Sequence, residues 1–437
     1  MKNLTKLTLQ SKMLIKSMMI SNIVAAVLTI GIYRGAFMSG QLAASDTVIE
    51  SIVSKELLES AASVVIVAID DKTVQELGRI GDWPRRYYAQ VVDRISDGFA
   101  RQIVIDVLFA ESNADDGMVT DALTRFLNVS PGDMQKAQPT LNRRSVILPI
   151  IGIPDREKTA ISEVPVVYLR SLSPTQAYLR ASSAVGSTLL MPDSDGVVRR
   201  SPALVRIGDQ VVPSLGLAAL VAYHNPDDRA YERARDGSGI LAAGRLIPTD
   251  EFLNLAIGFG GPPSRADGRR SNVFAVVRFI DVMNGLVEPS LFRDKSVFIG
   301  TLDATGVGDE FPVPTSPGHG MMAGVEAQAT IFSTIQAGRF FTEQQRWVTA
   351  FIVWFFCVVS GLVIYRFKIL LSVLIFVAIG VLYTVGALLY CAVAYDPRGI
   401  PIPNLFYPPW ALLVVFIAEV VFASPNARLF VSYDRNS

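Results

Sequence analysis

Four long apolar segments divide the chain. They cover residues 17–33, 347–365, 369–395 and 406–423, and Glu419 is the one charged residue that they contain. A helix needs about 20 apolar residues to cross about 30 Å of hydrocarbon. The pattern therefore predicts four transmembrane α-helices, one before and three after the long middle part of the chain.

Basic residues gather at one end of each predicted span. Four lysines precede the first segment, Arg366 and Lys368 fill the short turn between the second and third, and Arg428 and Arg435 follow the fourth. Basic loops near membrane helices stay in the cytoplasm. If every segment spans the lipid bilayer, all of these residues fall on that side.

This orientation predicts a cytoplasmic N-terminus (1–16), an exported domain (41–343) and a short cytoplasmic tail (424–437). We expect a multi-pass membrane protein with a large periplasmic or extracellular domain. An alternative for the first segment is a secretory signal peptide, because the small residues at 42–45 resemble a cleavage site. Glu419 lies near the cytoplasmic end of the fourth span, where we expect it to reach water.

Between the apolar segments, short apolar runs predict a folded α/β domain. The runs 64–69 and 103–109 are short, rich in β-branched residues and followed by acidic ones, as is typical of buried strands. A segment with helical periodicity lies between them, and the sequence 82–84 (Asp-Trp-Pro) indicates its start. Together they form a βαβ unit with a parallel pair of strands.

Further elements follow the same patterns, and they predict an α/β fold with a mixed sheet around the βαβ core. The buried face of the first long helix carries Tyr88, Val91, Val92 and Ile95. Strands are expected at 145–152, 253–259 and 296–299, a hairpin with an Asp195-Gly196 turn at 184–207, and helices at 41–62, 213–223, 279–286 and 324–341.

Composition narrows the class of protein. Half of the 437 residues are apolar and 18% are charged, which is too apolar for one soluble domain and too polar in the middle for a pure helix bundle. Lysine plus arginine equal aspartate plus glutamate at 40 each, so no basic field indicates nucleic acid. Both cysteines, Cys357 and Cys391, lie in predicted spans, which excludes a disulfide framework or cysteine metal site in the exported domain.

The βαβ unit carries the first group of candidate functional residues. Asp70 and Asp71 follow the first strand, Asp106 interrupts the second, and Arg85 lies near the start of the helix. A buried carboxylate needs a partner or a shifted pKa, and ligands of open α/β sheets bind at the carboxyl ends of strands. The residues predict either a polar pocket or a structural salt-bridge network that fixes the helix to the sheet.

A second group follows the strand at 296–299. The glycine-rich loop at 300–309 contains Asp303 and Asp309 but lacks the GK[ST] ending of a phosphate-binding loop. His319 and Glu326 are weak candidates for a metal site with these aspartates. The alternative is that the aspartates fix the loop and Glu326 begins the next helix. No cofactor is expected.

At this point the residues resemble a known family. The stretches VVIVAIDDKTVQELGRIGDWPRRYYAQVVDRISDGFARQIVIDVLFAE, PDSDGVVRR and VFIGTLDATGVGDEFPVPTSPGHGMMAGVEAQATIFSTIQAGRF are similar to successive blocks of the type-2 CHASE domain, the cyclase- and histidine-kinase-associated sensing extracellular domain. The resemblance covers about residues 41–341 and includes one span before and three after. It implies an extracytoplasmic input module of a bacterial receptor.

The resemblance also sets the expected function. It implies a sensor that passes an envelope signal to a cytoplasmic cyclase or kinase, and a homodimer as the working unit. We expect that effector to be a separate chain and this protein not to be an enzyme, because the sequence contains no catalytic motif and residues 424–437 are too few for an output domain. The alternatives are an envelope assembly protein that docks a partner and the sensing half of a truncated adenylate or guanylate cyclase receptor.

Candidate ligand-binding residues of this sensor come from both groups. They are Asp70, Asp71, Trp83, Arg85, Asp106, Asp303 and Asp309.

Overall fold

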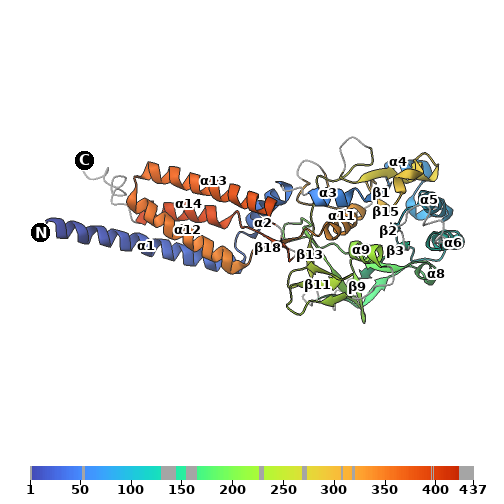
Figure 1. The fold of residues 1–437 in the computed structure, drawn as a ribbon, viewed down its shortest axis with the longest axis horizontal. Coiled ribbons are helices and arrows are strands. Elements are labelled where there is room, and N and C mark those ends of the chain that lie inside the picture. Colours follow the sequence, from blue (N-terminus) through green and yellow to red (C-terminus); the bar gives the residue numbers. More distant parts are fainter. Residues whose placement is uncertain are drawn as a thin grey trace, which may run out of the picture. The chain divides into compact units, whose positions relative to one another are not determined.

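The computed structural model divides the chain into two compact units (Figure 1). It describes residues 2–51, 55–128, 144–153, 165–225, 231–267, 273–306, 309–316, 320–394, 396 and 398–422. The helical unit comprises Met1–Ile52, Glu343–Ala394 and Pro401–Ser437, and the α/β unit comprises Val53–Thr342 and Tyr395–Ile400.

The helical unit is a bundle of apolar helices that run alongside one another (Figure 1). The helices of the bundle are α1 (Lys2–Arg34), α12 (Arg346–Arg366), α13 (Ile369–Val393) and α14 (Tyr407–Phe422), and the unit also contains the shorter helix α2 (Met38–Ser51). Val353 and Cys357 of α12 and Ala411 and Val415 of α14 are fully buried where these helices meet. The outward faces remain apolar: Leu370, for example, is 76% exposed.

Three of these helices are long and apolar enough to cross a membrane. They are Leu14–Arg34, Arg346–Arg366 and Ile369–Val393, among the residues that the structure describes. The fourth predicted span corresponds to α14, an apolar helix of 16 residues, and residue 423 lies outside the described part. Cys357 and Cys391 lie buried in α12 and α13. The count of four spans therefore stays a prediction.

Glu419 differs from its expected position at a water interface. The residue is 1% exposed and its Oε1 accepts a hydrogen bond of 2.6 Å from Ser17 Oγ of α1. Ser17 Oγ also lies 3.1 Å from the carbonyl oxygen of Gly361 in α12. The sequence pattern places Glu419 near the end of a helix but does not show that α1 covers it there. Within this unit the Ser17 hydroxyl therefore connects α1 with both α14 and α12.

The α/β unit is built on a seven-stranded sheet. All its neighbouring strands are parallel except β3 and β5, so the sheet is mixed as predicted. Along the order β14–β1–β15–β2–β3–β5, with β6 also pairing with β3, the strands are β14 (Ala275–Arg278), β1 (Val64–Ile69), β15 (Ser296–Thr301), β2 (Gln102–Ile105), β3 (Ser145–Ile153), β5 (Arg170–Leu172) and β6 (Ala184–Ser187). The predicted strands at 64–69, 145–152 and 296–299 are confirmed.

The predicted pairing of the first two strands is wrong. β15 lies between β1 and β2, with Ile66 opposite Phe298 on one side and Phe298 opposite Val104 on the other. Every residue of β1 and β2 is buried, as expected of central strands with helices on both faces. Such continuous apolar runs do not show which strands are neighbours. β2 also ends at Ile105, before the predicted end at 109.

Helices cover both faces of the sheet (Figure 1). One face carries α4 (Asp71–Leu77), α5 (Arg86–Asp97), α6 (Asp116–Leu127), α8 (Gln176–Arg180) and α10 (Phe279–Met283), with the short 3₁₀ helices η1 (Ile80–Asp82) and η2 (Pro289–Phe292). The other face carries α3 (Lys55–Ala61), α9 (Leu215–His224) and α11 (Gly324–Ala337). On that face Phe298 of β15 meets Phe332 of α11 with ring centroids 5.8 Å apart.

The start of α5 also differs from the prediction. Asp82 belongs to η1, and α5 begins at Arg86 without a side-chain cap from Arg85. The predicted buried face is confirmed, since Tyr88, Val91, Val92 and Ile95 are all buried against the sheet.

Short strands form the rest of the α/β unit. They are β4 (Val166–Tyr168), β8 (Leu204–Ile207) and β9 (Gln210–Pro213) in one sheet, β10 (Tyr231–Arg233), β11 (Gly239–Ala242) and β12 (Arg245–Pro248) in another, and the pairs β7 (Arg200–Pro202) with β13 (Asn254–Ala256) and β16 (Glu310–Phe311) with β17 (Met322–Ala323). The Asp195-Gly196 turn is present, with Gly196 at a φ of 84°. The predicted hairpin is wrong, because β6 pairs with β3 and β7 with β13.

The helix α11 starts at the predicted residue but ends early. Gly338 adopts the left-handed conformation after Ala337, and β18 (Phe341–Glu343) precedes α12. The last strand, β19 (Ile400–Ile402), precedes α14. The helix predicted at 324–341 therefore does not continue as a helix into Arg346–Arg366.

Candidate ligand pocket

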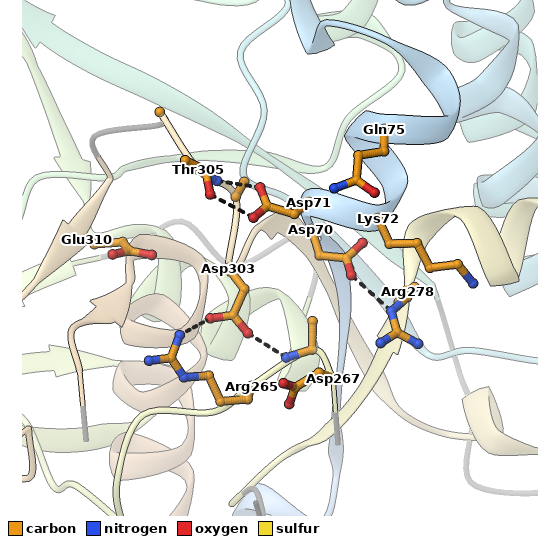
Figure 2. A pocket seen from close by; sticks show the side chains of 13 residues that line it. Asp70, Asp71, Lys72, Gln75, Arg265, Asp267, Arg278, Asp303, Thr305 and Glu310 are labelled. Atoms are coloured by element: carbon orange, nitrogen blue, oxygen red, sulfur yellow. Dashed lines mark hydrogen bonds and ion pairs between the residues drawn. The ribbon is translucent and has the colours of Figure 1, made fainter. Parts of the chain in front are cut away.

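A pocket of about 860 Å³ lies at the carboxyl ends of β14, β1 and β15 (Figure 2). Ligands of parallel sheets bind at this edge of the sheet. The volume of the pocket is within the usual range for small-molecule sites. The lining comes from the start of α4, the end of β14, the loop after β15, the loop segment 265–267 and the start of β16. Its residues are Asp70, Asp71, Lys72, Gln75, Arg265, Ala266, Asp267, Arg278, Asp303, Ala304, Thr305, Gly306 and Glu310.

Asp70 joins the end of β1 to the start of α4 and to β14. Its Oδ1 accepts hydrogen bonds from Thr73 N at 3.0 Å and Thr73 Oγ1 at 2.7 Å, which caps α4. Its Oδ2 lies 2.9 Å from Arg278 Nε at the end of β14. The side chain is buried, so this arginine supplies the charge that a buried carboxylate requires.

Asp71 holds the loop that follows β15. Its two carboxylate oxygens accept hydrogen bonds from Thr305 N at 2.6 Å and Thr305 Oγ1 at 2.7 Å. These hydrogen bonds, that of the Thr305 hydroxyl first, lower the pKa of Asp71. The backbone adds two contacts, from Leu302 N to Ile69 O and from Asp71 N to Asp303 O. Two segments far apart in the sequence thus form one wall.

Asp303 connects the loop after β15 to the segment 265–267, which forms the opposite wall of the pocket. It has a φ of 57° and points its carboxylate at Arg265 Nη1 and at Ala266 N, the latter at 2.7 Å from Oδ2 (Figure 2). The hydrogen bond with Asp303 raises the pKa of Arg265. Positive φ is costly for a residue with a side chain, so these charge-assisted contacts stabilise a strained position.

Asp106 and Asp309 lie together outside this lining. Asp106 N donates to Ile299 O at 2.7 Å, which extends the β2–β15 pairing by one residue. Burial, with a smaller contribution from the Asp309 carboxylate, raises the pKa of Asp106 to about 7. Burial also raises the pKa of Asp309, whose carboxylate packs on Gly324: a Cβ there would lie 2.3 Å from Oδ2. Asp309 thus lies against the start of α11, near enough to Asp106 for its charge to affect the pKa of that residue.

Glu326, in the first turn of α11, connects this helix to the pocket. It is 1% exposed, and both carboxylate oxygens lie 3.0 Å from Ser264 N. Ser264 precedes Arg265 and Ala266, which hold Asp303. Burial raises the pKa of Glu326 to about 7, although the bonds from Ser264 oppose the change. A chain of contacts therefore runs from α11 to the pocket wall.

The comparison with known protein families agrees with this architecture. The model of the CHASE2 domain matches residues 23–365. The chain belongs to the CHASE2 domain family. This is a sensory domain family, and the resemblance inferred from the sequence is confirmed. Searches of curated proteins and of solved structures found no match.

The structure of this CHASE2 protein does not assemble the pocket that the sequence predicts from Asp70, Asp71, Arg85 and Asp106. Asp70 and Asp71 line the pocket, but β15 separates them from Asp106. Arg85 Nε lies 3.5 Å from Asp116 Oδ1, and its guanidinium covers the ring of Phe109 at 4.8 Å. This contact joins α5 to α6, so the predicted network that fixes the helix to the sheet through Arg85 is wrong.

Trp83 is likewise a packing residue rather than part of the pocket. It is 2% exposed, its Nε1 donates to Gly78 O at 2.8 Å, and its ring packs on Phe279 at 5.4 Å. Of the two metal candidates, His319 lies outside the described residues. Among those that are described, no group of three or more His, Cys, Asp and Glu side chains could hold a metal ion.

Several pocket residues of the CHASE2 protein give little signal in the sequence. Arg278 is a basic residue at the carboxyl end of β14, a strand that the pattern does not predict because it is only four residues long. Lys72 follows the Asp70-Asp71 pair and could have been found with it. Arg265 and Thr305 lie on loops, and Glu310 begins the two-residue strand β16, so none of them gives a periodic signal.

Proposed function

We propose that this CHASE2 protein is a membrane-anchored sensor whose α/β unit binds a small polar signal molecule outside the cytoplasm. The observation that carries the proposal is the pocket at the carboxyl edge of the parallel sheet, in a chain of a sensory domain family. Its lining is dominated by charged and polar side chains, so the signal is a hydrophilic molecule rather than a lipid.

The helical unit is the proposed membrane anchor. Support comes from three helices with the length and hydropathy of membrane spans, and from α14 as a shorter fourth. The basic residues that flank them favour a cytoplasmic position for residues 1–16 and the Arg366–Lys368 turn. We place the protein in a bacterial plasma (inner) membrane with the α/β unit in the periplasm.

Signal transfer requires two states of the α/β unit with different affinities for the ligand. The contacts suited to this role connect the pocket loop at Asp303 with the segment 264–267 and with Glu326 of α11. A ligand that moves this segment changes the position of α11, which precedes β18 and α12 in the chain. We propose that the change reaches a cytoplasmic cyclase or kinase through the helices, and that the protein acts as a homodimer without enzymatic activity of its own.

Thiol labelling tests the proposed orientation. Asp121 is an exposed residue of α6, and Lys12 is an exposed residue of α1. In intact spheroplasts, a membrane-impermeant maleimide will label Asp121→Cys but will label Lys12→Cys only after the membrane is permeabilised. The wild-type protein is the control, because Cys357 and Cys391 are buried. Labelling of Lys12→Cys alone in intact spheroplasts contradicts the proposal.

A further inference from the structure

The pocket lining has more negative than positive groups. Five carboxylates, from Asp70, Asp71, Asp267, Asp303 and Glu310, face three cationic side chains, from Lys72, Arg265 and Arg278. A cavity with walls of low dielectric concentrates such a field and attracts ions of the opposite sign. The formal excess of two negative charges therefore favours a cation as the occupant.

The cationic groups already have carboxylate partners. Arg278 pairs with Asp70 at 2.9 Å, Arg265 pairs with Asp303, and Lys72 Nζ lies 3.6 Å from Asp281 Oδ1. An anionic ligand would have to break or share these ion pairs and enter a negative field. The basic side chains thus stabilise the walls.

Two carboxylates lack a comparable partner. Asp71 accepts hydrogen bonds from Thr305, an uncharged residue, and each of its oxygens has a further lone pair to offer. The same hydrogen bonds lower the pKa of Asp71, so it stays ionised at neutral pH. Glu310 is exposed at the other side of the pocket (Figure 2), and Arg265, the cation whose pKa its charge also raises, forms its hydrogen-bonded ion pair with Asp303 instead.

We propose that the pocket binds a small hydrophilic amine whose ammonium groups are held by Asp71 and Glu310. This inference rests on the proposed function and names the ligand class of the same site. An ammonium group offers three donors and no acceptor, which suits carboxylate oxygens. The polar lining excludes amines with large apolar groups.

The test compares three ligands with the same four-carbon backbone. Isothermal titration calorimetry measures their affinities for the purified full chain in detergent at low ionic strength. The ligands are the diamine putrescine, the diacid succinate and the neutral diol 1,4-butanediol. We expect putrescine to bind most tightly. Its affinity will fall as salt is added, because salt screens charges that are accessible to solvent.

Matched variants locate the binding. Asp71→Asn keeps an acceptor for Thr305, and Glu310→Gln changes an exposed side chain, so both retain the fold. Each will weaken putrescine binding about tenfold, the effect of losing one charged hydrogen bond, whereas Asp121→Asn on α6 will have no effect. If succinate or butanediol binds more tightly than putrescine, and Asp303→Ala weakens that binding, the ligand is not an amine. The proposal that this pocket binds a ligand would still hold. Putrescine binding unchanged in both pocket variants, or no binding of any of the three, overturns the inference.

Discussion

Asp106→Asn will stabilise the α/β unit at pH 8 by up to about 4 kcal/mol and remove much of the pH dependence of its stability. Burial raises the pKa of Asp106 from 3.8 to about 7, and a pKa difference of one between the folded and unfolded states corresponds to about 1.4 kcal/mol. Because the folded state binds this proton more tightly than the unfolded state, the free energy of unfolding falls as pH rises from about 4 to 7. Asparagine is never ionised and avoids that loss.

Pulse proteolysis of the full chain in urea measures this effect. Wild type and Asp106→Asn are compared between pH 5 and pH 8, with Asp121→Asn as a control for loss of a carboxylate at an exposed position. Burial also raises the pKa of Asp309. The variant therefore keeps a smaller pH dependence, which comes from Asp309. A variant as pH-dependent as wild type would show that the pKa of Asp106 is not raised in the folded protein.

Glu326→Ala will destabilise the α/β unit by about 3 kcal/mol. It will also loosen the wall of the ligand pocket that residues 264–267 form. The change removes the acceptor of Ser264 N, a buried donor. It also leaves a cavity beside α11 where the glutamate side chain was packed. It also frees the segment that holds Asp303 through Ala266 N. Urea unfolding reports the loss of stability, and hydrogen exchange of residues 264–267 reports the loosened wall.

Glu326→Gln separates the two roles of this side chain. The amide oxygen still accepts from Ser264 N, so stability will fall by less than about 1 kcal/mol and residues 264–267 will remain protected. Equal damage by glutamine and alanine would show that the negative charge, rather than the hydrogen bond, stabilises this contact.

The sequence predicts the central elements of the fold well, because continuous β-branched runs such as β1 and β15 are buried on both faces. It does not predict their order. β15 enters between β1 and β2 from the far end of the domain, and no residue pattern within the runs records this neighbour. The hairpin at 184–207 fails for the same reason, since β6 and β7 each pair with a strand from elsewhere in the chain.

The candidate site shows the same division. Asp70, Asp71 and Asp303 can be named from the sequence because each follows a predicted strand, and the structure brings them to one edge. The grouping of Arg85 and Asp106 with Asp70 assumes that β1 and β2 are adjacent, so both residues are misplaced together. Arg265 lies in a loop whose position depends on Glu326 of α11, a tertiary contact that spacing cannot reveal.

Hydrogen exchange of the full chain in lipid nanodiscs tests the central claim most directly. The probes are putrescine, spermidine, succinate, glutamate and glucose, added one at a time. A sensor with its pocket at the sheet edge will show slower exchange at residues 70–75, 264–267 and 303–306 with at least one probe, and altered exchange in α11. No change in these segments with any probe, or changes confined to other parts of the α/β unit, would contradict the account.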